Sequence, residues 1–323
     1  MFQIAAGLVA GLVLFLYGVT RLSNALRATF GERLERGLAR FTRNRFAGVG
    51  TGAVATAVVD SSSVTIATVI ALLHAGVLPF AHSLGVILGA NIGTTVSSQL
   101  FAMRGAAFAP LALALGFALY SFGKSERVRE GGGALLGLGL IFFGLEQMAH
   151  AVEPLRGHPA FAEWMTRLEN PLLGLLAGLV ATAVLQSSSA TLGLAITLAG
   201  EGMLTLPAGV AVMLGAEVGT CADTLLASLG RSRAALRAGL FHLGFNAGAA
   251  LAGLALVSQL ADAAALMSGG VARQIANAHL LFNVLGVALV VGFLPRIARW
   301  MHRLVPDEAP RVSIPPSSVP VGA

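Results

Sequence analysis

Apolar residues fill the chain in long blocks, and charged residues gather in short clusters between them. Most blocks run about 18–25 residues, long enough for a helix to cross the ~30 Å hydrocarbon layer of a membrane. No strand-like alternation of apolar and polar residues dominates, which favours helices over a β-barrel. The pattern therefore predicts an all-α polytopic membrane protein with about seven full spans plus two re-entrant helical hairpins. The predicted full spans are 3–20, 82–101, 106–123, 132–150, 207–228, 236–260 and 275–293.

Two polar interruptions break the apolar pattern, and they are nearly the same. Residues 57–65 read AVVDSSSVT, and residues 183–191 read AVLQSSSAT. When the sequence is shifted by 126 residues, 48–95 align on 174–221 without a gap and with 21 identities in 48 positions. A repeat of this length indicates a duplicated unit, and duplicated halves are typical of secondary transporters.

The charge of the loops predicts that the two halves run in opposite directions. Cytoplasmic loops carry an excess of lysine and arginine. Four clusters are basic and are expected in the cytoplasm: 21–45, 124–130, 231–237 and 296–303. The segment 151–170, with three glutamates and two arginines, is expected outside. All of these assignments hold only if the blocks 47–79 and 171–206 each return to the side from which they enter, with the N-terminus outside and the C-terminus in the cytoplasm.

The predicted organisation is an inverted repeat with a C-terminal extension. We expect one repeat over 1–126, containing hairpin 47–79, and a second over 127–260, containing hairpin 171–206. An extra transmembrane span is expected in 261–305, and the Pro- and Ser-rich tail 306–323 is expected to be disordered. The compact loops suit a multi-pass protein of a bacterial plasma (inner) membrane.

The serine runs suit the turn between two half-helices inside a membrane. Non-helical backbone at that depth survives only when it is buried in protein or lines a wet cavity. Two hairpins from opposite faces would bring two helix N-termini together near the midplane, and helix N-termini attract anions. Serine hydroxyls add donors for an oxyanion, and their lone pairs are hard ligands for a sodium ion.

These motifs resemble those of the type II sodium–phosphate cotransporters and their bacterial relatives. That family is similar in having two inverted repeats, each with a QSSS hairpin followed by a G-A/S-N-I-G-T motif. The corresponding residues here are DSSS at 60–63 with GANIGT at 89–94, and QSSS at 186–189 with GAEVGT at 215–220. An H-x-x-F-N element also looks present at 242–246 and again at 279–283, and the resemblance covers roughly residues 1–295.

The resemblance implies sodium-driven uptake of inorganic phosphate by alternating access. Phosphate would lie between the two serine runs, which are Ser61, Ser62, Ser63, Ser187, Ser188 and Ser189. Polar residues around them would hold or couple the cation: Asp60, Gln186, Thr65, Thr191, Asn91, Thr94, Thr95, Glu217, Thr220 and Asp223. Sodium would be the coupling ion, no other metal and no cofactor is implied, and a homodimer is left open.

Two carboxylates depart from the family pattern, and a third lies nearby. Asp60 replaces the first glutamine, Glu217 replaces the second asparagine, and Asp223 follows in the same block. An ionisable residue inside a span is a functional hypothesis by default. Asp60 could be a stronger sodium ligand, Asp60 and Glu217 could take up protons and make coupling proton-driven, or the altered pocket could prefer another ion. Asp223 could instead face water near the end of a span.

Other classes of function fit the sequence poorly. His242 and His279 each have an asparagine one helical turn on, which indicates polar contacts between helices more than a proton relay. Triplet serines duplicated in both halves do not fit a single catalytic nucleophile, and the chain has no G-x-S-x-G, H-E-x-x-H or Walker A motif. We therefore expect neither an enzyme nor an ATP-driven pump, and the basic loops indicate membrane topology and not nucleic-acid binding. A passive channel stays open as an alternative.

Overall fold

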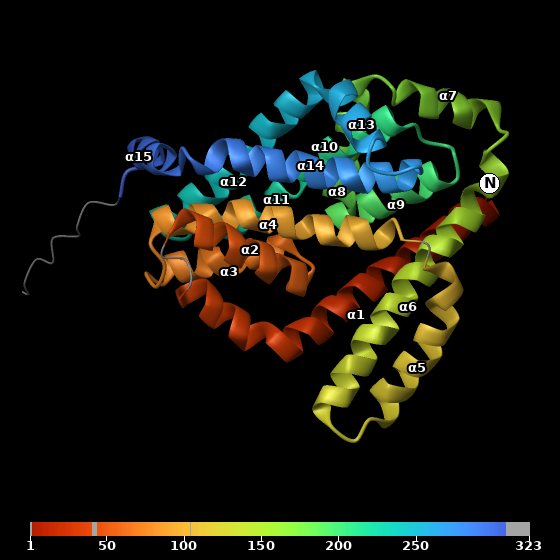
Figure 1. Cartoon of the computed structure of the whole chain (residues 1–323), viewed down its shortest axis with the longest axis horizontal. Coiled ribbons are helices and arrows are strands. Elements are labelled where there is room, and N and C mark those ends of the chain that lie inside the picture. Colours follow the sequence, from red (N-terminus) through yellow and green to blue (C-terminus); the bar gives the residue numbers. More distant parts are fainter. Residues whose placement is uncertain (1, 41–43, 104, 308–323) are drawn as a thin grey trace, which may run out of the picture.

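The computed structural model describes residues 2–40, 44–103 and 105–307. In these residues the chain forms helices joined by short turns, and it contains no strand (Figure 1). The protein is an all-α polytopic membrane protein, as predicted. Its helices are α1 (Phe2–Arg40), α2 (Arg45–Val59), α3 (Ser62–His74), α4 (Phe80–Phe101), η1 (Ala106–Phe108), α5 (Ala109–Phe122), α6 (Glu126–Val152), η2 (Glu153–Leu155), α7 (Pro159–Arg167), α8 (Pro171–Leu185), α9 (Ser188–Gly200), α10 (Leu206–Gly219), α11 (Cys221–Ser228), α12 (Arg233–Ala255), α13 (Val257–Ala265), α14 (Val271–Val291) and α15 (Leu294–Leu304).

Six of the described helical segments are long and apolar enough to cross a membrane, and they match six of the seven predicted spans. The seventh, 106–123, forms η1 and the shorter apolar helix α5. The first span is much longer than predicted, because α1 continues through the basic segment to Arg40. Leucine, arginine, alanine and glutamate in that segment are good helix formers, so charge marks the end of the apolar stretch and not the end of the helix. The predicted disordered tail lies, from residue 308 on, outside the described residues.

The contact between α1 and α6 shows how the two halves are related. Under the 126-residue shift Gly11 corresponds to Gly137, and Gly18 corresponds to Gly144. A side chain at Gly11 would press on the Gly144 carbonyl, and a side chain at Gly18 would press on the Gly137 carbonyl. Equivalent helices therefore cross antiparallel, each through the same two glycines. This reciprocal contact is the signature of a pseudo-two-fold axis, and it makes the repeats inverted.

Each hairpin packs on the helix that follows it through glycines at equivalent places. A Cβ at Gly89 of α4 would overlap the Val49 carbonyl oxygen of α2. In the second half, a Cβ at Gly215 of α10 would overlap the Leu175 carbonyl oxygen of α8. Small residues allow membrane helices to approach this closely. The glycines of the two GANIGT-like motifs therefore hold the hairpins in place.

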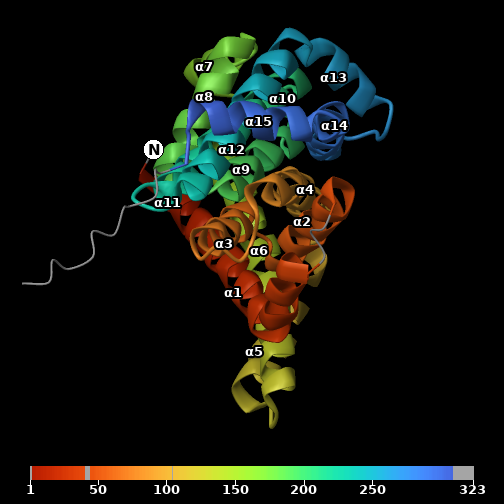
Figure 2. The same ribbon diagram turned by 90° about the vertical axis from the view of Figure 1, so that its left-hand side faces the viewer.

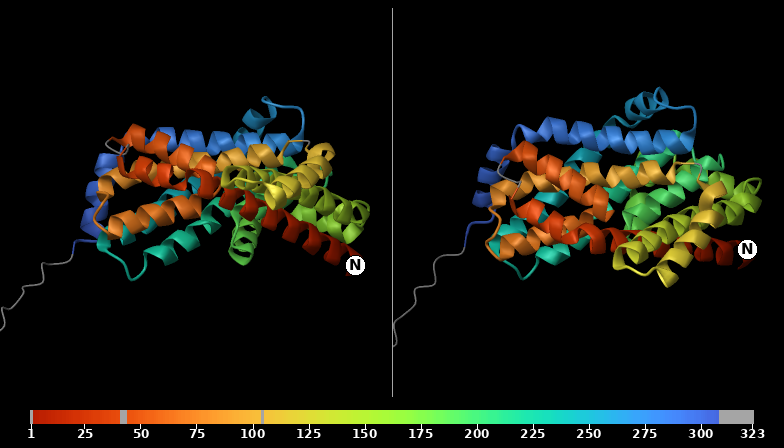
Figure 3. Two further views of the ribbon diagram at one scale, coloured as in Figure 1. Left: turned by 90° about the horizontal axis from the view of Figure 1, so that it is seen from below. Right: turned by 60° about the horizontal axis from the view of Figure 1, so that its bottom comes forward.

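The two hairpins enter the molecule from opposite ends (Figure 3). At one end, Arg45 at the start of α2 donates to the Gly292 carbonyl at the end of α14, and the Ser232 amide donates to His74 at the end of α3. At the other end, Glu201 after α9 pairs with Arg156 beyond η2. Figure 2 faces the first end and shows α15 stretched across it. The tips of the hairpins consequently point toward each other inside the molecule.

Candidate functional site

The tips of the two hairpins have the same backbone geometry. Asp60 and Gln186 end the first half-helices with φ/ψ of 57°/32° and 50°/32°, and they are the only non-glycine residues with positive φ in the described chain. Ser61 and Ser187 then cap α3 and α9 from extended conformations, with φ/ψ of −158°/111° and −155°/109°. Each of these serine hydroxyls accepts a hydrogen bond from the amide three residues on, at 3.3 Å and 3.2 Å. The DSSS and QSSS motifs therefore form the same turn in both repeats.

This turn leaves hydrogen-bond donors at the start of two helices. The first amides of a helix have no partner within it. Ser61 and Ser187 each satisfy the third amide of their helix, which leaves the amides of the next two serines for a ligand. The positive ends of the helix dipoles of α3 and α9 add to this attraction for an anion.

Both tips line one cavity of about 340 Å³. Its lining includes the six serines predicted to bind phosphate: Ser61, Ser62, Ser63, Ser187, Ser188 and Ser189. Five of the ten predicted cation residues also line it: Asp60, Gln186, Thr94, Thr220 and Asp223. The structure therefore brings together residues that are more than 120 positions apart in the sequence, as the repeat predicts.

One wall of the cavity comes from α1, which the sequence analysis assigned no role. Thr20, Ser23, Asn24 and Arg27 line the cavity from one face of this helix. Ser23 also donates to the Val59 carbonyl at 2.5 Å, which fixes α1 against the end of α2. Arg27 gives the cavity a cation that has no counterpart in the serine motifs. The signal was present as polar residues at i, i+3, i+4 and i+7 following an apolar span.

Asp60 places a carboxylate in the cavity wall, and one of its two oxygens has no hydrogen-bond partner among the described residues. Its Oδ1 accepts a hydrogen bond from the hydroxyl of Ser97 on α4. Its Oδ2 is buried and has no hydrogen-bond partner among the described residues, and neither has the buried Oγ1 of Thr56, one helical turn earlier on α2. Oxygens of this kind, near the end of α2, are the ligands that a sodium ion prefers.

Asp223 links the two halves at the same cavity. Its Oδ2 accepts a hydrogen bond from the Ser63 hydroxyl at 3.4 Å, and the side chain is partly buried. It stands where the first repeat has Ser97, since 97 and 223 differ by 126. Both residues contact the first hairpin. Asp223 therefore belongs to the cavity lining, and whether it serves the cation or faces water there stays open.

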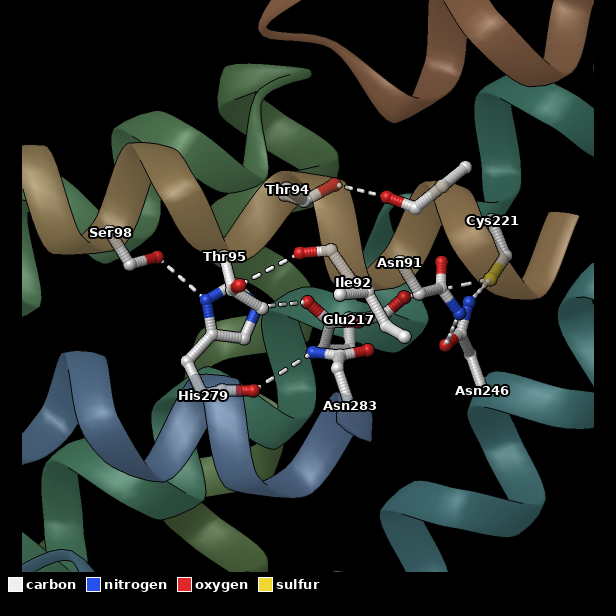
Figure 4. A network of polar contacts seen from close by, with 11 residues as sticks. Asn91, Ile92, Thr94, Thr95, Ser98, Glu217, Cys221, Asn246, His279 and Asn283 are labelled. Carbon is white, nitrogen blue, oxygen red and sulfur yellow. Dashed lines mark hydrogen bonds and ion pairs between the residues drawn. The ribbon is translucent and has the colours of Figure 1, made fainter. Parts of the chain in front are cut away.

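The other five predicted cation residues do not line the cavity. Thr65 donates to the Ser61 carbonyl at 3.2 Å, and Thr191 accepts a hydrogen bond from Thr182 at 2.8 Å. These two threonines brace the hairpin turns. Asn91, Thr95 and Glu217 lie instead in a separate polar network between α4, α10 and the C-terminal helices (Figure 4). A binding role for these five residues stays a prediction.

That second network is centred on a buried carboxylate–histidine pair. Glu217 Oε1 lies 2.7 Å from His279 Nε2, and His279 Nδ1 lies 2.6 Å from the Ser98 hydroxyl. Glu217 is 5% exposed, while His279 and Ser98 are fully buried. Three helices, α4, α10 and α14, therefore meet in one chain of polar contacts (Figure 4).

The second histidine repeats part of this arrangement. His242 Nδ1 lies 2.7 Å from the hydroxyl of Thr224, which is the repeat equivalent of Ser98. Asn246, one turn along α12, accepts a hydrogen bond from Asn91 at 2.9 Å and donates to Cys221. Both H-x-x-F-N elements thus join α4 and α10–α11 to the C-terminal helices. This supports polar contact between helices, as expected for both histidines.

Comparison with known proteins identifies the family. The model of the Na+/Pi-cotransporter family matches residues 14–150 and 157–294, which together make up most of the chain. The chain belongs to the Na+/Pi-cotransporter family. The second matched stretch extends through α14, so the family pattern includes the helix that carries His279. The multi-pass architecture of this Na+/Pi-cotransporter family member agrees with its apolar helices.

Curated relatives of this family member carry different functional names. The chain is 29% identical over 303 residues to "Uncharacterized protein YqeW" of Bacillus subtilis, covering 94% of this chain and 86% of the relative. It is 25% identical over 302 residues to "Putative inorganic phosphate export protein YjbB" of Escherichia coli, covering 93% of this chain but only 56% of that protein. A shorter stretch of 113 residues is 31% identical to "Sodium-dependent phosphate transport protein 2B" of Pongo abelii, covering 33% of this chain and 16% of that protein. No solved structure matches the chain.

Proposed function

We propose that the protein is a secondary transporter that moves inorganic phosphate across the membrane together with sodium. The observation that carries this proposal is the convergence of two serine-capped helix N-termini on one cavity. Amides, hydroxyls and Arg27 offer donors from both halves of the molecule to a tetrahedral oxyanion. Membership of the Na+/Pi-cotransporter family supports phosphate as the substrate.

A sodium ion would bind at the end of α2, next to this anion site. Thr56 Oγ1 and Asp60 Oδ2 supply two unsatisfied oxygens at the end of α2. The C-terminal end of a helix carries a negative dipole end, which favours a cation there. A bound sodium ion would also offset the repulsion between Asp60 and phosphate. Phosphate would therefore bind well only once sodium has bound, which is the requirement for coupling.

Alternating access fits the inverted repeat. The repeats, divided as 1–126 and 127–260, present equivalent hairpins from opposite ends of the molecule to a shared site. Movement of the hairpin-bearing parts against the remaining helices would open the site to one side at a time. We place the end that carries α15 in the cytoplasm of a bacterium, because its loops are rich in arginine. Direction would follow the sum of the sodium and phosphate gradients, which accommodates relatives named for export and relatives named for sodium-dependent transport.

Proton coupling is the second candidate, and the Glu217–His279 pair favours it. Ionisable side chains that contact each other inside a transmembrane bundle often mark proton relays in transporters. The pair lies off the cavity, so a proton there would act by changing how α4, α10 and α14 pack. Sodium is the first candidate because the unsatisfied oxygens line the α2 tip itself.

Uptake of radiolabelled phosphate into proteoliposomes tests this proposal. Purified protein is reconstituted and given an imposed sodium gradient, an imposed proton gradient or neither. We expect saturable uptake only with the sodium gradient, and loss of most of that uptake in Ser188→Ala. Uptake driven by the proton gradient alone would favour the second candidate. Equal, non-saturating phosphate flux under all three conditions would indicate a channel.

A further inference from the structure

A long apolar groove runs along the outside of the molecule between α12 and α14. It has a volume of about 730 Å³, and all its lining residues except Gln259 are apolar or glycine. Gly244 and Gly248 of α12 form part of its floor, and a Cβ at either position would meet no atom within 4 Å. Leu285 and Leu289 of α14 form the facing wall. The groove is therefore an unfilled hollow on the outer surface of the described helices.

One end of the groove meets a basic hollow. Arg296, Arg299 and Arg303 of α15 line a second depression of about 320 Å³ together with Trp300. Trp300 also lines the apolar groove, so the two surfaces join at this side chain. Among the residues that the structure describes, no carboxylate lines either of them. A continuous surface therefore runs from the apolar groove, past Trp300, to three exposed arginines.

Helix α15 is held firmly in this position. Its inner face is buried through Leu294, Ala298 and Met301. Just before α15, the Gly292 carbonyl accepts a hydrogen bond from the Arg45 side chain. At its far end the buried Arg237 of α12 donates to the Val305 carbonyl at 2.9 Å and also contacts His302 and Asp307. The arginine face of α15 is consequently a fixed feature that lies across the end of the helices (Figure 2).

We propose that this surface binds one anionic phospholipid. The acyl chain would lie in the groove between α12 and α14, and the charged headgroup would lie against the three arginines. Trp300 would sit at the boundary, because tryptophan favours the level of the headgroups. Basic residues at the end of an amphipathic helix attract anionic lipid, each contributing to affinity. The site is separate from the cavity of the serine hairpins.

The three arginines favour a phospholipid over a second copy of the chain as the occupant of the groove. A parallel dimer formed through the groove would bring two sets of three arginines to the same end of the assembly, where like charges repel. An anionic headgroup has the complementary charge. Free phosphate would engage the arginines alone and would make no use of the groove.

Native mass spectrometry of the full-length protein tests the proposal. Protein in mild detergent is titrated with anionic phosphatidylglycerol or, for comparison, with phosphatidylcholine, whose zwitterionic headgroup has no net charge. We expect one retained phosphatidylglycerol per chain in the wild type and affinity weaker by about a hundredfold in the triple variant Arg296→Gln/Arg299→Gln/Arg303→Gln. The matched control Lys124→Gln/Arg127→Gln/Arg129→Gln removes the same charge at the exposed start of α6 and should retain the lipid.

A second variant tests the groove without changing charge. Gly248→Leu places a side chain into the open floor of the groove and should also release phosphatidylglycerol. Inorganic phosphate added to the same samples should not displace the lipid. Three results would overturn the proposal: equal retention of both lipids, retention in Gly248→Leu, or a wild-type dimer that Gly248→Leu converts to monomers without any change in lipid.

Discussion

The hydroxyl of Ser63 in the first hairpin donates a hydrogen bond to Asp223 of the second half, at 3.4 Å. Through this contact the two repeats meet at the wall of a single cavity, although their motifs lie far apart in the sequence. In the proposed mechanism this carboxylate lies beside the anion site, so it would influence the electrostatic balance between phosphate and its counter-cation.

Removal of the Asp223 charge should strengthen phosphate binding. Asp223→Asn keeps an acceptor for Ser63 and removes a like charge near the anion. We expect the phosphate KM at fixed sodium to fall about tenfold, the size expected for one nearby charge at the surface of a protein. The measurement is the phosphate dependence of uptake into proteoliposomes. A raised KM would mean that Asp223 instead recruits a cation that phosphate requires.

Arg27 should contribute attraction from the opposite side of the cavity. Arg27→Gln removes the one basic side chain that the described residues contribute to the lining, and it should raise the phosphate KM about tenfold. Arg27→Lys should recover part of that loss, because the charge remains. Arg36→Gln on the same helix removes an exposed arginine outside the cavity and serves as the control. A KM for Arg27→Gln equal to that of this control would remove Arg27 from the site.

The unsatisfied oxygens of α2 should determine sodium affinity. Asp60→Gln, which restores the residue of the family pattern, should raise the half-saturating sodium concentration about tenfold or more while uptake continues. Thr56→Val removes the other buried oxygen at nearly constant shape and should act in the same direction. Thr68→Val is the matched control, because the hydroxyl of Thr68 only bonds back to its own helix. If the sodium dependence of both α2 variants matched this control, the proposed cation site would be wrong.

The Glu217–His279 pair should stabilise the protein. Loss of one partner of a buried hydrogen-bonded pair typically costs about 1–3 kcal/mol, since the other partner is left unpaired. We therefore expect Glu217→Ala to lower the thermal unfolding temperature in detergent well below that of Glu217→Gln, which keeps an acceptor for His279. The double variant Glu217→Ala/His279→Ala should lose less than the sum of the single losses. Additive losses would show that the two side chains do not depend on each other.

Close crossing of the hairpins should make some glycines irreplaceable. Gly89→Ala forces a Cβ against the Val49 carbonyl and should destabilise the fold by at least about 1–3 kcal/mol. Gly50→Ala on α2 adds the same methyl group where no atom lies within 4 Å, and it should be neutral or slightly stabilising. Thermal unfolding and the yield of folded protein check both. Equal behaviour of the two variants would contradict the crossing geometry.

The sequence predicts the site well where the repeat carries it. The shift of 126 residues places Asp60 opposite Gln186 and each serine opposite its counterpart, and the structure gives these turns matching dihedral angles. Loop charge predicts hairpins that enter from opposite ends, because hairpins alone reconcile the basic clusters. These inferences need only local patterns and one long-range symmetry.

Other features depend on packing that the sequence pattern does not record. Helix α1 was expected to end near residue 20, yet it continues to Arg40 and brings Arg27 to the cavity. Glu217 was expected among the cation residues because it occupies a position of the family's GANIGT motif, and the structure places its side chain against His279, outside the cavity. A role in cation coupling stays a prediction. Which face of a buried helix meets the site depends on its rotation against its neighbours, and a helix that is apolar on all sides gives no periodic signal for that rotation.

Both hairpin tips are proposed to form one anion site. Sodium-dependent binding of phosphate to the purified protein tests this directly. Equilibrium binding of radiolabelled phosphate is measured for the wild type, for Ser62→Ala, for its repeat equivalent Ser188→Ala, and for the exposed control Ser121→Ala. We expect each hairpin variant to bind phosphate about tenfold or more weakly than the wild type, as expected for a lost hydrogen bond to a charged ligand. The control should bind phosphate with wild-type affinity. Wild-type affinity in either hairpin variant would contradict a site shared by the two repeats.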